Sequence, residues 1–426
     1  MEMVLQYLWK HRMLSDRLRT TDGRRVIVHY AGRHNTDAGP DFCGARLSIG
    51  GEEWAGNIEI HVKASDWRRH RHDTDKAYDN VILHLVNVND TEVATSTGRK
   101  IAQAEVSYPT AFTSLYSRLA EHIGDFRCEH AIGSLAPLTV TDWQGSLSVE
   151  RMQQKASRIL DTVKALDNDW EWACFTALAR ALGSGLNSEP LEMTARSIPL
   201  RILHKHSDDA MQLEAILLGQ AGLLDTSAHI FDEYYQRLCR EYIFLAHKYG
   251  LKPLRRDLWK LSKTRPQNFP TRRIAMLANL ATGGFSMLSA ILSRDFSIES
   301  TKHLFDRQLG EYWGHHYDFG TEGSNLPRFI SAQHRILLTI NFVAPILYAY
   351  GMSHNDYDMT ERAMGLWEQA PAENNRYVRR WHNAGIDCTC AADSQAIIQL
   401  SREYCERGRC MECRFGHSLL RKAMEP

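Results

Sequence analysis

The stretch that decides the fold of the first part of the chain reads Trp-Ala-Gly-Asn-Ile-Glu-Ile-His-Val-Lys and spans residues 54–63. Side chains alternate between the two faces of a β-strand, so the two isoleucines and the valine share one face, which we expect to be buried. Glu59, His61 and Lys63 share the other face. Because a buried charge is costly unless it is paired or bound to a metal, three adjacent ionisable groups require an explanation.

One explanation is a divalent-metal site. Asp41, in the Gly-Pro-Asp-Phe segment at 39–42, precedes this strand. Its carboxylate and that of Glu59 would supply the oxygen ligands that Mg²⁺ or Mn²⁺ prefers. His61 and Lys63 would then orient a water molecule or stabilise charge on a phosphate. The alternative is an exposed strand face whose charges pair with one another, and the residues alone leave both explanations open.

A polar segment follows the strand, and we expect several of its side chains around the same site: Asp66, His70, His72 and Asp73. Its His-x-His-Asp pattern suggests zinc, because imidazole is a common zinc ligand. The further His of a dinuclear metallohydrolase motif does not follow the Asp, however, and a solvated polar loop is the alternative. His84 lies inside the apolar run 81–86, so we expect it to be a hydrogen-bonded core residue or to face the site.

The hydrophobic period divides the chain. Helix and strand patterns alternate up to about residue 110, and helical stripes dominate after it. The predicted fold class is therefore α+β, with a mixed α/β domain at 1–110, a helical domain at 111–387 and a Cys-rich helical tail at 388–426. We expect a helix at 2–14, strands at 25–30, 45–49, 54–63 and 78–88, hairpins at 50–51 and between 91–95 and 99–107, and helices at 141–166, 169–182, 211–224, 231–249, 272–280 and from 326 onward.

Composition limits the partners. The chain has 426 residues, with 51 Lys plus Arg and 51 Asp plus Glu, so its net charge gives no general attraction to nucleic acid or to an acidic membrane. A nucleic-acid partner would need a local basic groove. The longest apolar run, 336–350, contains Asn341 and Pro345 and predicts a buried helix rather than a membrane span. Nine cysteines without a secretory signal indicate reduced thiols or metal ligands, and hence a cytoplasmic protein with no membrane partner.

Five of the nine cysteines lie close together in the tail, in the segments Cys-Thr-Cys at 388–390 and Cys-x4-Cys-x2-Cys at 405–413. Cys-x2-Cys is a chelating spacing for zinc, and iron–sulfur sites use it too. We expect a Zn²⁺ or Fe–S site at Cys390, Cys405, Cys410 and Cys413. Buried thiols without a metal are the alternative.

Arg265, Arg272 and Arg273 form a local basic cluster near a predicted helix start. Such a cluster could bind a phosphate of the substrate at the helix N-terminus. A capped helix with arginine ion pairs is the commoner explanation of this pattern.

Three phrases at 35–47, 54–67 and 78–86 resemble the signature of an uncharacterised bacterial family, domain of unknown function 2851. Later stretches at 219–224, 265–278 and 340–351 and the Cys-rich tail are also similar to it. The resemblance spans nearly the whole chain, and it brings no assigned activity.

The first domain also resembles the PD-(D/E)XK nuclease-like superfamily. Pro40-Asp41 matches its Pro-Asp, Glu59 matches the following acid, and Glu2 matches the acid on the preceding helix. His61 stands where the family has Lys, and Lys63 comes two residues late. The resemblance implies a nuclease-like α/β fold and a metal-dependent nuclease or phosphodiesterase acting on nucleic acid. The alternative is a nuclease-like fold that has lost catalysis and serves as a binding or scaffold protein.

Overall fold

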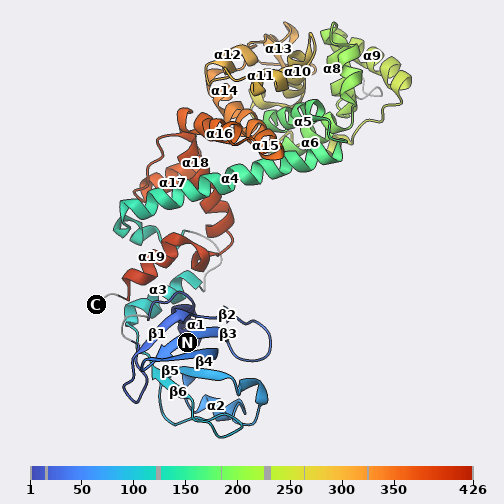
Figure 1. Ribbon diagram of the computed structural model, residues 1–426. Coiled ribbons are helices and arrows are strands. Elements are labelled where there is room, and N and C mark those ends of the chain that lie inside the picture. Colours follow the sequence, from blue (N-terminus) through green and yellow to red (C-terminus); the bar gives the residue numbers. More distant parts are fainter. Residues whose placement is uncertain are drawn as a thin grey trace. The chain divides into compact units, whose positions relative to one another are not determined.

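The computed structural model describes residues 2–14, 18–120, 126–183, 185–224, 232–262, 264–323 and 326–424. Contacts divide the chain into two compact units. Unit 1 comprises Met1–Val140 with Glu403–Pro426, and unit 2 comprises Thr141–Arg402. The fold class is α+β, as predicted, with a sheet in the N-terminal part and a largely helical remainder (Figure 1). The last part of the predicted tail, from Glu403 onward, belongs to the same compact unit as the N-terminal residues. The predicted domain boundaries at 110 and 387 stay predictions.

Unit 1 is built on a mixed six-stranded sheet. Its order is β1-β3-β4-β5-β6, with the short β2 paired to β3. β1, β3 and β4 are antiparallel, whereas β4, β5 and β6 are parallel. Gly50 and Gly51 join β3 to β4 with positive φ values of 62° and 93°, which a tight two-residue hairpin requires and the sequence predicted. The strands are β1 (Val26–Tyr30), β2 (Arg33–His34), β3 (Phe42–Ile49), β4 (Glu52–Lys63), β5 (Val81–Val88) and β6 (Ala102–Glu105).

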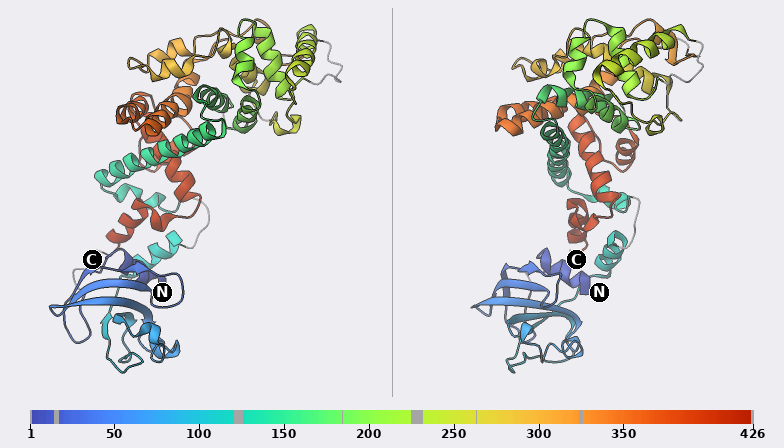
Figure 2. Two further views of the ribbon diagram at one scale, coloured as in Figure 1. Left: turned by 45° about the vertical axis from the view of Figure 1, so that its right-hand side comes forward. Right: turned by 90° about the vertical axis from the view of Figure 1, so that its right-hand side faces the viewer.

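One face of β4 contributes to the main apolar cluster of unit 1, and α2, which belongs to a second cluster, packs against the strand. Ile58 and Ile60 pack with Leu5 and Trp9 of helix α1 (Glu2–Lys10) in the main core of the unit. A smaller cluster contains Trp67 of helix α2 (Asp66–Arg69) and residues of the 78–101 region. Glu59 and His61 alternate with the isoleucines and therefore lie on the α2 side of the strand. Helix α1 and the α2 segment flank the sheet on different sides (Figure 2).

The rest of unit 1 is helical. Helix α3 (Thr110–Ala120) and the 3₁₀ turn η2 (Glu129–Ser134) follow the sheet. At the C-terminal end, the 3₁₀ turn η7 (Cys410–Glu412) leads into helix α19 (Arg414–Lys422). Both C-terminal elements pack against α3, and α19 also packs against η2. The first and last segments of the chain therefore form one compact unit.

Unit 2 consists of helices and one small hairpin. Acidic N-caps mark several predicted helix starts: Asp169 accepts a hydrogen bond from the backbone N–H of Trp172, and Asp232 accepts one from Tyr235. The helices are α4 (Pro137–Ala165, which begins in unit 1), α5 (Trp170–Leu182), α6 (Ser188–Arg196), α7 (Leu200–Lys205), α8 (Ala210–Gln220), α9 (Glu233–Tyr249), α10 (Pro270–Ala281), α11 (Met287–Leu292), α12 (Ser300–Leu304), α13 (Tyr312–His315), α14 (Ala332–Leu338), α15 (Ala344–His354), α16 (Tyr357–Gln369), α17 (Arg376–Asn383) and α18 (Ala391–Gln399).

Two details of unit 2 differ from the sequence expectation. Strands β7 (His316–Asp318) and β8 (Thr321–Glu322) form a hairpin, with Gly320 at a φ of 63°, where only helices were expected. These strands are too short to give a recognisable alternating pattern. The predicted helix 231–249 begins at Glu233, and its expected first residue, Phe231, lies outside the described residues.

Among the described residues, one helical stretch, Ala332–His354, is long and apolar enough to cross a membrane. Within its most apolar window, 67% is buried inside the structure. That burial is typical of a core helix of unit 2, as the polar Asn341 and the Pro345 in the sequence predicted.

Candidate metal centre

The α2-facing side of β4 buries two of the predicted site residues. Glu59 is 5% exposed and His61 is 1% exposed. β4 pairs with the parallel strand β5 in a register that sets Glu59 beside His84, which is fully buried. Glu59 and His61 therefore do not lie on an exposed strand face, which was the alternative to a metal site. Their burial requires partners inside the protein.

His70 and His72 reach the same place from the turn after α2. Arg71, between them, has a φ of 63°, a left-handed conformation that is strained for a residue with a side chain. The turn is closed by a hydrogen bond from the His72 N–H to the Trp67 carbonyl. The imidazole of His72 is then stacked on the Tyr78 ring, with centroids 3.7 Å apart. The turn thereby directs two imidazoles toward β4.

These side chains form a compact set of donor atoms. Ligand atoms of His61, His70 and His72 all lie within 4.8 Å of one another. Nε2 of His61 is 3.1 Å from Nδ1 of His70. Oε1 of Glu59 is 3.5 Å from Nε2 of His61 and 3.3 Å from Nε2 of His72. For comparison, the ligand atoms of a tetrahedral ion with bonds of about 2.0–2.2 Å stand about 3.3–3.6 Å apart.

Asp41 directly precedes β3 and approaches Glu59 from there. The β3–β4 ladder ends at the pair Phe42 and Ile58. The backbone N–H of Ile60, two residues further along β4, therefore lies beyond the last pair with β3. Oδ2 of Asp41 accepts a hydrogen bond from this N–H at 2.9 Å. The Asp41 N–H in turn donates to Oε2 of Glu59 at 3.1 Å. One oxygen of Glu59 thus faces the imidazoles and the other faces Asp41.

Negative charge accumulates on the Asp41 side. Burial, together with the charges of Glu59 and Glu2, raises the pKa of Asp41 to about 7. Burial and then the charge of Glu59 also raise the pKa of Glu2, on helix α1. A bound cation would offset this charge and favour the ionised form of Asp41 and of Glu2.

The imidazoles of His61 and His84 are held neutral. Burial, with the charges of neighbouring histidines acting in the same direction, lowers the pKa of each to about 3. A neutral imidazole has one ring nitrogen with a free lone pair, which is the form that binds metals. His61 contacts Nε2 of His84 through its own Nδ1 at 2.9 Å. If Nδ1 carries the proton, the lone pair of His61 lies on Nε2, which faces Glu59 and His70.

Other predicted residues have different places. Lys63 is exposed, and its charge acts on Asp90, whose pKa it helps to lower, rather than joining the buried cluster. Asp66 is buried, accepts a hydrogen bond from the Lys63 N–H and pairs with Arg69, so it positions the turn. Asp73 is half-buried and has no hydrogen bond to the cluster among the described residues.

The arginine cluster is largely buried, in unit 2. Arg272 is 2% exposed and Arg273 is 5% exposed. Arg272 donates to backbone carbonyls, among them that of Pro327 at 2.7 Å, and Arg273 donates to His334 at 2.7 Å. Arg265 precedes the turn η4 (Pro266–Asn268) and is exposed. The expectation that this cluster presents a phosphate-binding surface is corrected by this burial: two of its three side chains are used inside the unit.

The tail cysteines are divided between the units. Cys390 is the N-cap of α18 in unit 2, whereas Cys405, Cys410 and Cys413 belong to unit 1. The described residues whose ligand atoms lie within 4.8 Å in groups of three or more are the three histidines, so the thiols do not form such a group. The fourth ligand expected at Cys390 therefore has no support from the described geometry.

Two site residues were missed from the sequence. Gln6 donates to Oδ1 of Asp41 at 2.8 Å. Tyr78 holds His72, and burial with the charge of Glu59 raises its pKa to about 12. The signal for Gln6 was its spacing of four from Glu2, which sets both on one face of α1. Tyr78 had no local signal, because its role depends on the turn around His72.

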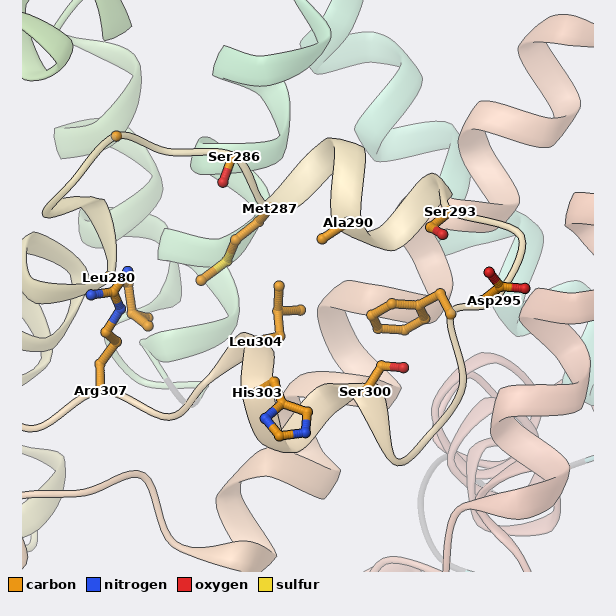
Figure 3. A pocket seen from close by; sticks show the side chains of 12 residues that line it. Leu280, Ser286, Met287, Ala290, Ser293, Asp295, Ser300, His303, Leu304 and Arg307 are labelled. Carbon is orange, nitrogen blue, oxygen red and sulfur yellow. The ribbon is translucent and has the colours of Figure 1, made fainter.

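A separate cavity of about 490 Å³ lies in unit 2, between α11 and α12 (Figure 3). Met287 and Leu304 face each other across it, and His303 and Arg307 also line it. It contains none of the predicted site residues.

The fold and the buried set define an α+β protein with a histidine–carboxylate cluster in its sheet-containing unit. Residues 2–376 match the model of a family described as "Protein of unknown function (DUF2851)", and the chain belongs to that family. This confirms the family resemblance seen in the sequence motifs. No curated protein and no solved structure matches the chain.

Proposed function

We propose that unit 1 is a divalent-metal-dependent hydrolase of phosphodiester bonds in nucleic acid. The observation that carries the proposal is the position of Glu59, with one oxygen toward the imidazoles and the other toward Asp41. The order of acids along the fold supports it: Glu2 on the first helix, Asp41 directly before β3 and Glu59 on the next strand, β4. PD-(D/E)XK nucleases have acids in this order, so the likeness is part of the proposal.

The donor set favours a particular class of ion. Asp41 and Glu59 alone would suit Mg²⁺ or Mn²⁺. Imidazole nitrogens suit Zn²⁺ and other transition ions better than Mg²⁺. We therefore propose Zn²⁺ or Mn²⁺ at Glu59, His61, His70 and His72, with Asp41 and Glu2 beside them. The ion would supply Lewis-acid activation of the phosphate and of a bound water.

The protein groups would divide the remaining work. His70 is the exposed member of the set, so a phosphate would approach from its side. Asp41, with a raised pKa and its backbone N–H hydrogen-bonded to Glu59, is suited to accept a proton from the attacking water. His61, neutral and buried, takes a ligand role where the resembling nucleases have Lys. The exposed Lys63 is not assigned a catalytic role.

Exposed arginines beside the histidines would bind the nucleic-acid backbone. Arg68 and Arg71 are exposed and flank His70, whereas Arg69 is paired with Asp66. These side chains provide the local basic surface that a chain of zero net charge needs for a phosphate polymer. They replace Arg272 and Arg273 as our candidates for substrate binding. The many buried thiols also fit a reducing compartment, and we propose a cytoplasmic location.

The test is a cleavage assay with the metal-stripped full chain. Labelled single-stranded DNA, duplex DNA, RNA and bis(p-nitrophenyl) phosphate are offered with Mn²⁺, Zn²⁺, Mg²⁺ or Ca²⁺. We expect cleavage with Mn²⁺ or Zn²⁺, a loss of at least about 100-fold in Asp41→Ala and Glu59→Gln, and near-normal activity in the control Asp73→Ala. Equal activity in all variants, or none in the wild type with any ion, contradicts catalysis at this site.

A binding protein without catalysis is the second candidate. It is favoured by the contacts of Glu59, whose two oxygens already have protein partners, and by the absence of an amine at the position of His61. In that case the protein would shift labelled nucleic acid in a gel and leave it uncut. Arg71→Ala would weaken the shift, and Glu59→Gln would leave it unchanged.

A further inference from the structure

Three buried cysteines lie in two segments of unit 1 that are far apart in the sequence. Cys128 directly precedes η2, Cys410 is the first residue of η7, and Cys413 directly follows η7. Each of the three is 6–7% exposed. None of them belongs to the histidine cluster, and Cys128 lies outside the Cys-rich tail in the sequence. The tail alone therefore gave no reason to consider it.

Packing brings the two segments into contact. A Cβ at Gly408 would be 3.2 Å from a guanidinium nitrogen of Arg127, the neighbour of Cys128. Lys422 of α19 donates to the Ser134 carbonyl at the end of η2. Figure 1 shows α19 next to α3. The contacts on both sides of Cys128 fix it against the tail.

Cys410 and Cys413 lie on a tight knuckle. The Cys413 N–H donates to the Cys410 carbonyl at 3.3 Å, and the His417 N–H donates to the Cys413 carbonyl at 2.9 Å. A Cβ at Gly416 would be only 2.1 Å from the Cys410 carbonyl oxygen, so α19 can begin this close to the knuckle only with glycine there. Cys-x2-Cys on such a turn is the arrangement that chelates a metal.

The surroundings of Cys128 disfavour its thiolate form. Burial, and then the charges of Cys413 and Cys410, raise the pKa of Cys128 to about 12. A bound cation reverses this preference, because it stabilises thiolates and releases their protons.

We propose that Cys128, Cys410 and Cys413 bind a thiolate-preferring metal centre, Zn²⁺ or an iron–sulfur cluster, with Cys405 as the fourth ligand. Cys405 begins the turn that returns the chain to Cys410: the Gly408 N–H donates to its carbonyl at 3.1 Å. The thiols do not lie within 4.8 Å of one another as the imidazoles do, so binding requires side-chain rotation about the Cα–Cβ bonds. The centre would join the N-terminal and C-terminal segments of unit 1, and it does not depend on the proposed hydrolase.

The experiment is cobalt substitution of the metal-stripped full chain. Co²⁺ bound by thiolates gives an intense charge-transfer absorption, which Co²⁺ bound by imidazoles lacks. We expect one thiolate-bound Co²⁺ per chain, loss of this absorption in Cys128→Ser and Cys413→Ser, and full retention in Cys390→Ser and in His72→Ala. Iron and sulfide analysis of the protein as isolated distinguishes a cluster from Zn²⁺.

Folding is monitored in parallel by circular dichroism. If a serine variant unfolds, the folded wild type is titrated with a mercurial thiol reagent instead. A coloured chelator then measures the Zn²⁺ that is released. Release of one ion as four thiols react supports the centre. A thiolate signal that survives Cys128→Ser, or a wild type that shows neither Co²⁺–thiolate absorption nor bound zinc or iron, overturns it.

Discussion

Nδ1 of His61 lies 2.9 Å from Nε2 of His84, inside the sheet-containing unit. His84 is fully buried, and its other ring nitrogen, Nδ1, has no hydrogen-bond partner among the residues that the structure describes. A buried polar atom without a partner lowers the free energy of unfolding, so Nδ1 of His84 destabilises the fold. The ring nevertheless keeps its contact with His61 through Nε2. In metal sites, a hydrogen bond to the far nitrogen of a histidine ligand fixes its tautomer and orientation.

His84 should therefore act as a positioning residue. We expect His84→Ala to weaken Mn²⁺ binding about 10–100-fold, without abolishing it, because the ligands themselves remain. His84→Gln, which keeps an acceptor, should recover part of this loss. Isothermal titration with Mn²⁺ measures both, with His29→Ala on the exposed face of β1 as the control. Unchanged affinity in His84→Ala would show that the contact has no role in metal binding.

The two basic residues of β4 should differ in their effects on activity. His61→Ala removes a buried ligand and should lower phosphodiesterase activity by at least about 100-fold. Lys63→Ala removes an exposed amine and should change it less than about threefold, since exposed charge pairs contribute little. The comparison is made at saturating Mn²⁺ with bis(p-nitrophenyl) phosphate. A severe defect in Lys63→Ala would return this residue to the catalytic set.

Substrate binding should depend on salt through the arginines beside His70. Replacing Arg68 or Arg71 with Ala should weaken binding of single-stranded DNA and lower the slope of log affinity against log salt by about one in each case. Lys302→Ala in unit 2, an exposed residue paired with Glu299, is the control and should leave the slope unchanged. Fluorescence anisotropy between low and high salt gives the slopes. Identical slopes in all three proteins argue against this surface.

Stability should fall as pH rises through the titration of Glu214. Burial raises the pKa of this carboxyl to about 7, while Trp313 and Tyr234 donate hydrogen bonds to it. The folded chain then holds a proton that the unfolded chain loses near pH 4.5. This proton contributes up to about 3 kcal/mol to the free energy of unfolding. The contribution is complete below pH 4.5 and is lost as the pH rises to about 7.

Glu214→Gln keeps an acceptor for both donors and cannot ionise. Relative to the wild type, the variant should gain unfolding free energy between pH 5 and pH 8, as measured by urea denaturation. A pH-independent difference between the two proteins would mean that Glu214 does not titrate in this range.

Two glycines in helices should respond oppositely to alanine. A Cβ at Gly219 of α8 would be 2.1 Å from the Tyr242 ring of α9, so Gly219→Ala should destabilise unit 2 by about 1–3 kcal/mol or more. Gly145 of α4 is exposed with nothing within 4 Å, and Gly145→Ala should stabilise by up to about 1 kcal/mol. Thermal unfolding followed by circular dichroism measures both, and equal shifts would contradict the described packing of α8 against α9.

Much of the sheet was predictable because its signals are local. The alternation around Glu59 and the glycines at 50–51 specify a buried strand and its hairpin within a short window. The spacing of four between Glu2 and Gln6 is an equally local signal, although only Glu2 was predicted as a site residue. The helix starts at Asp169 and Asp232 follow from capping chemistry.

The site itself was only partly predictable, because its members meet through tertiary contacts. His70 and His72 were predicted near the site, but their convergence on His61 depends on the left-handed Arg71, a conformation that the sequence does not reveal. Cys128 directly precedes η2, which packs against α19 of the tail from a distant part of the chain, so spacing could not suggest it. Arg272 and Arg273 were expected at the surface because charged side chains are rarely buried. Both are buried, and Arg272 donates to backbone carbonyls such as that of Pro327.

The most direct test of the metal centre is anomalous diffraction from crystals of the full chain loaded with Mn²⁺ or Zn²⁺. We predict a peak about 2.0–2.2 Å from Nε2 of His61, Nε2 of His72 and Nδ1 of His70, with Glu59 as an oxygen ligand. A crystal that contains the metal elsewhere, with these three imidazoles joined only by hydrogen bonds, would contradict the account.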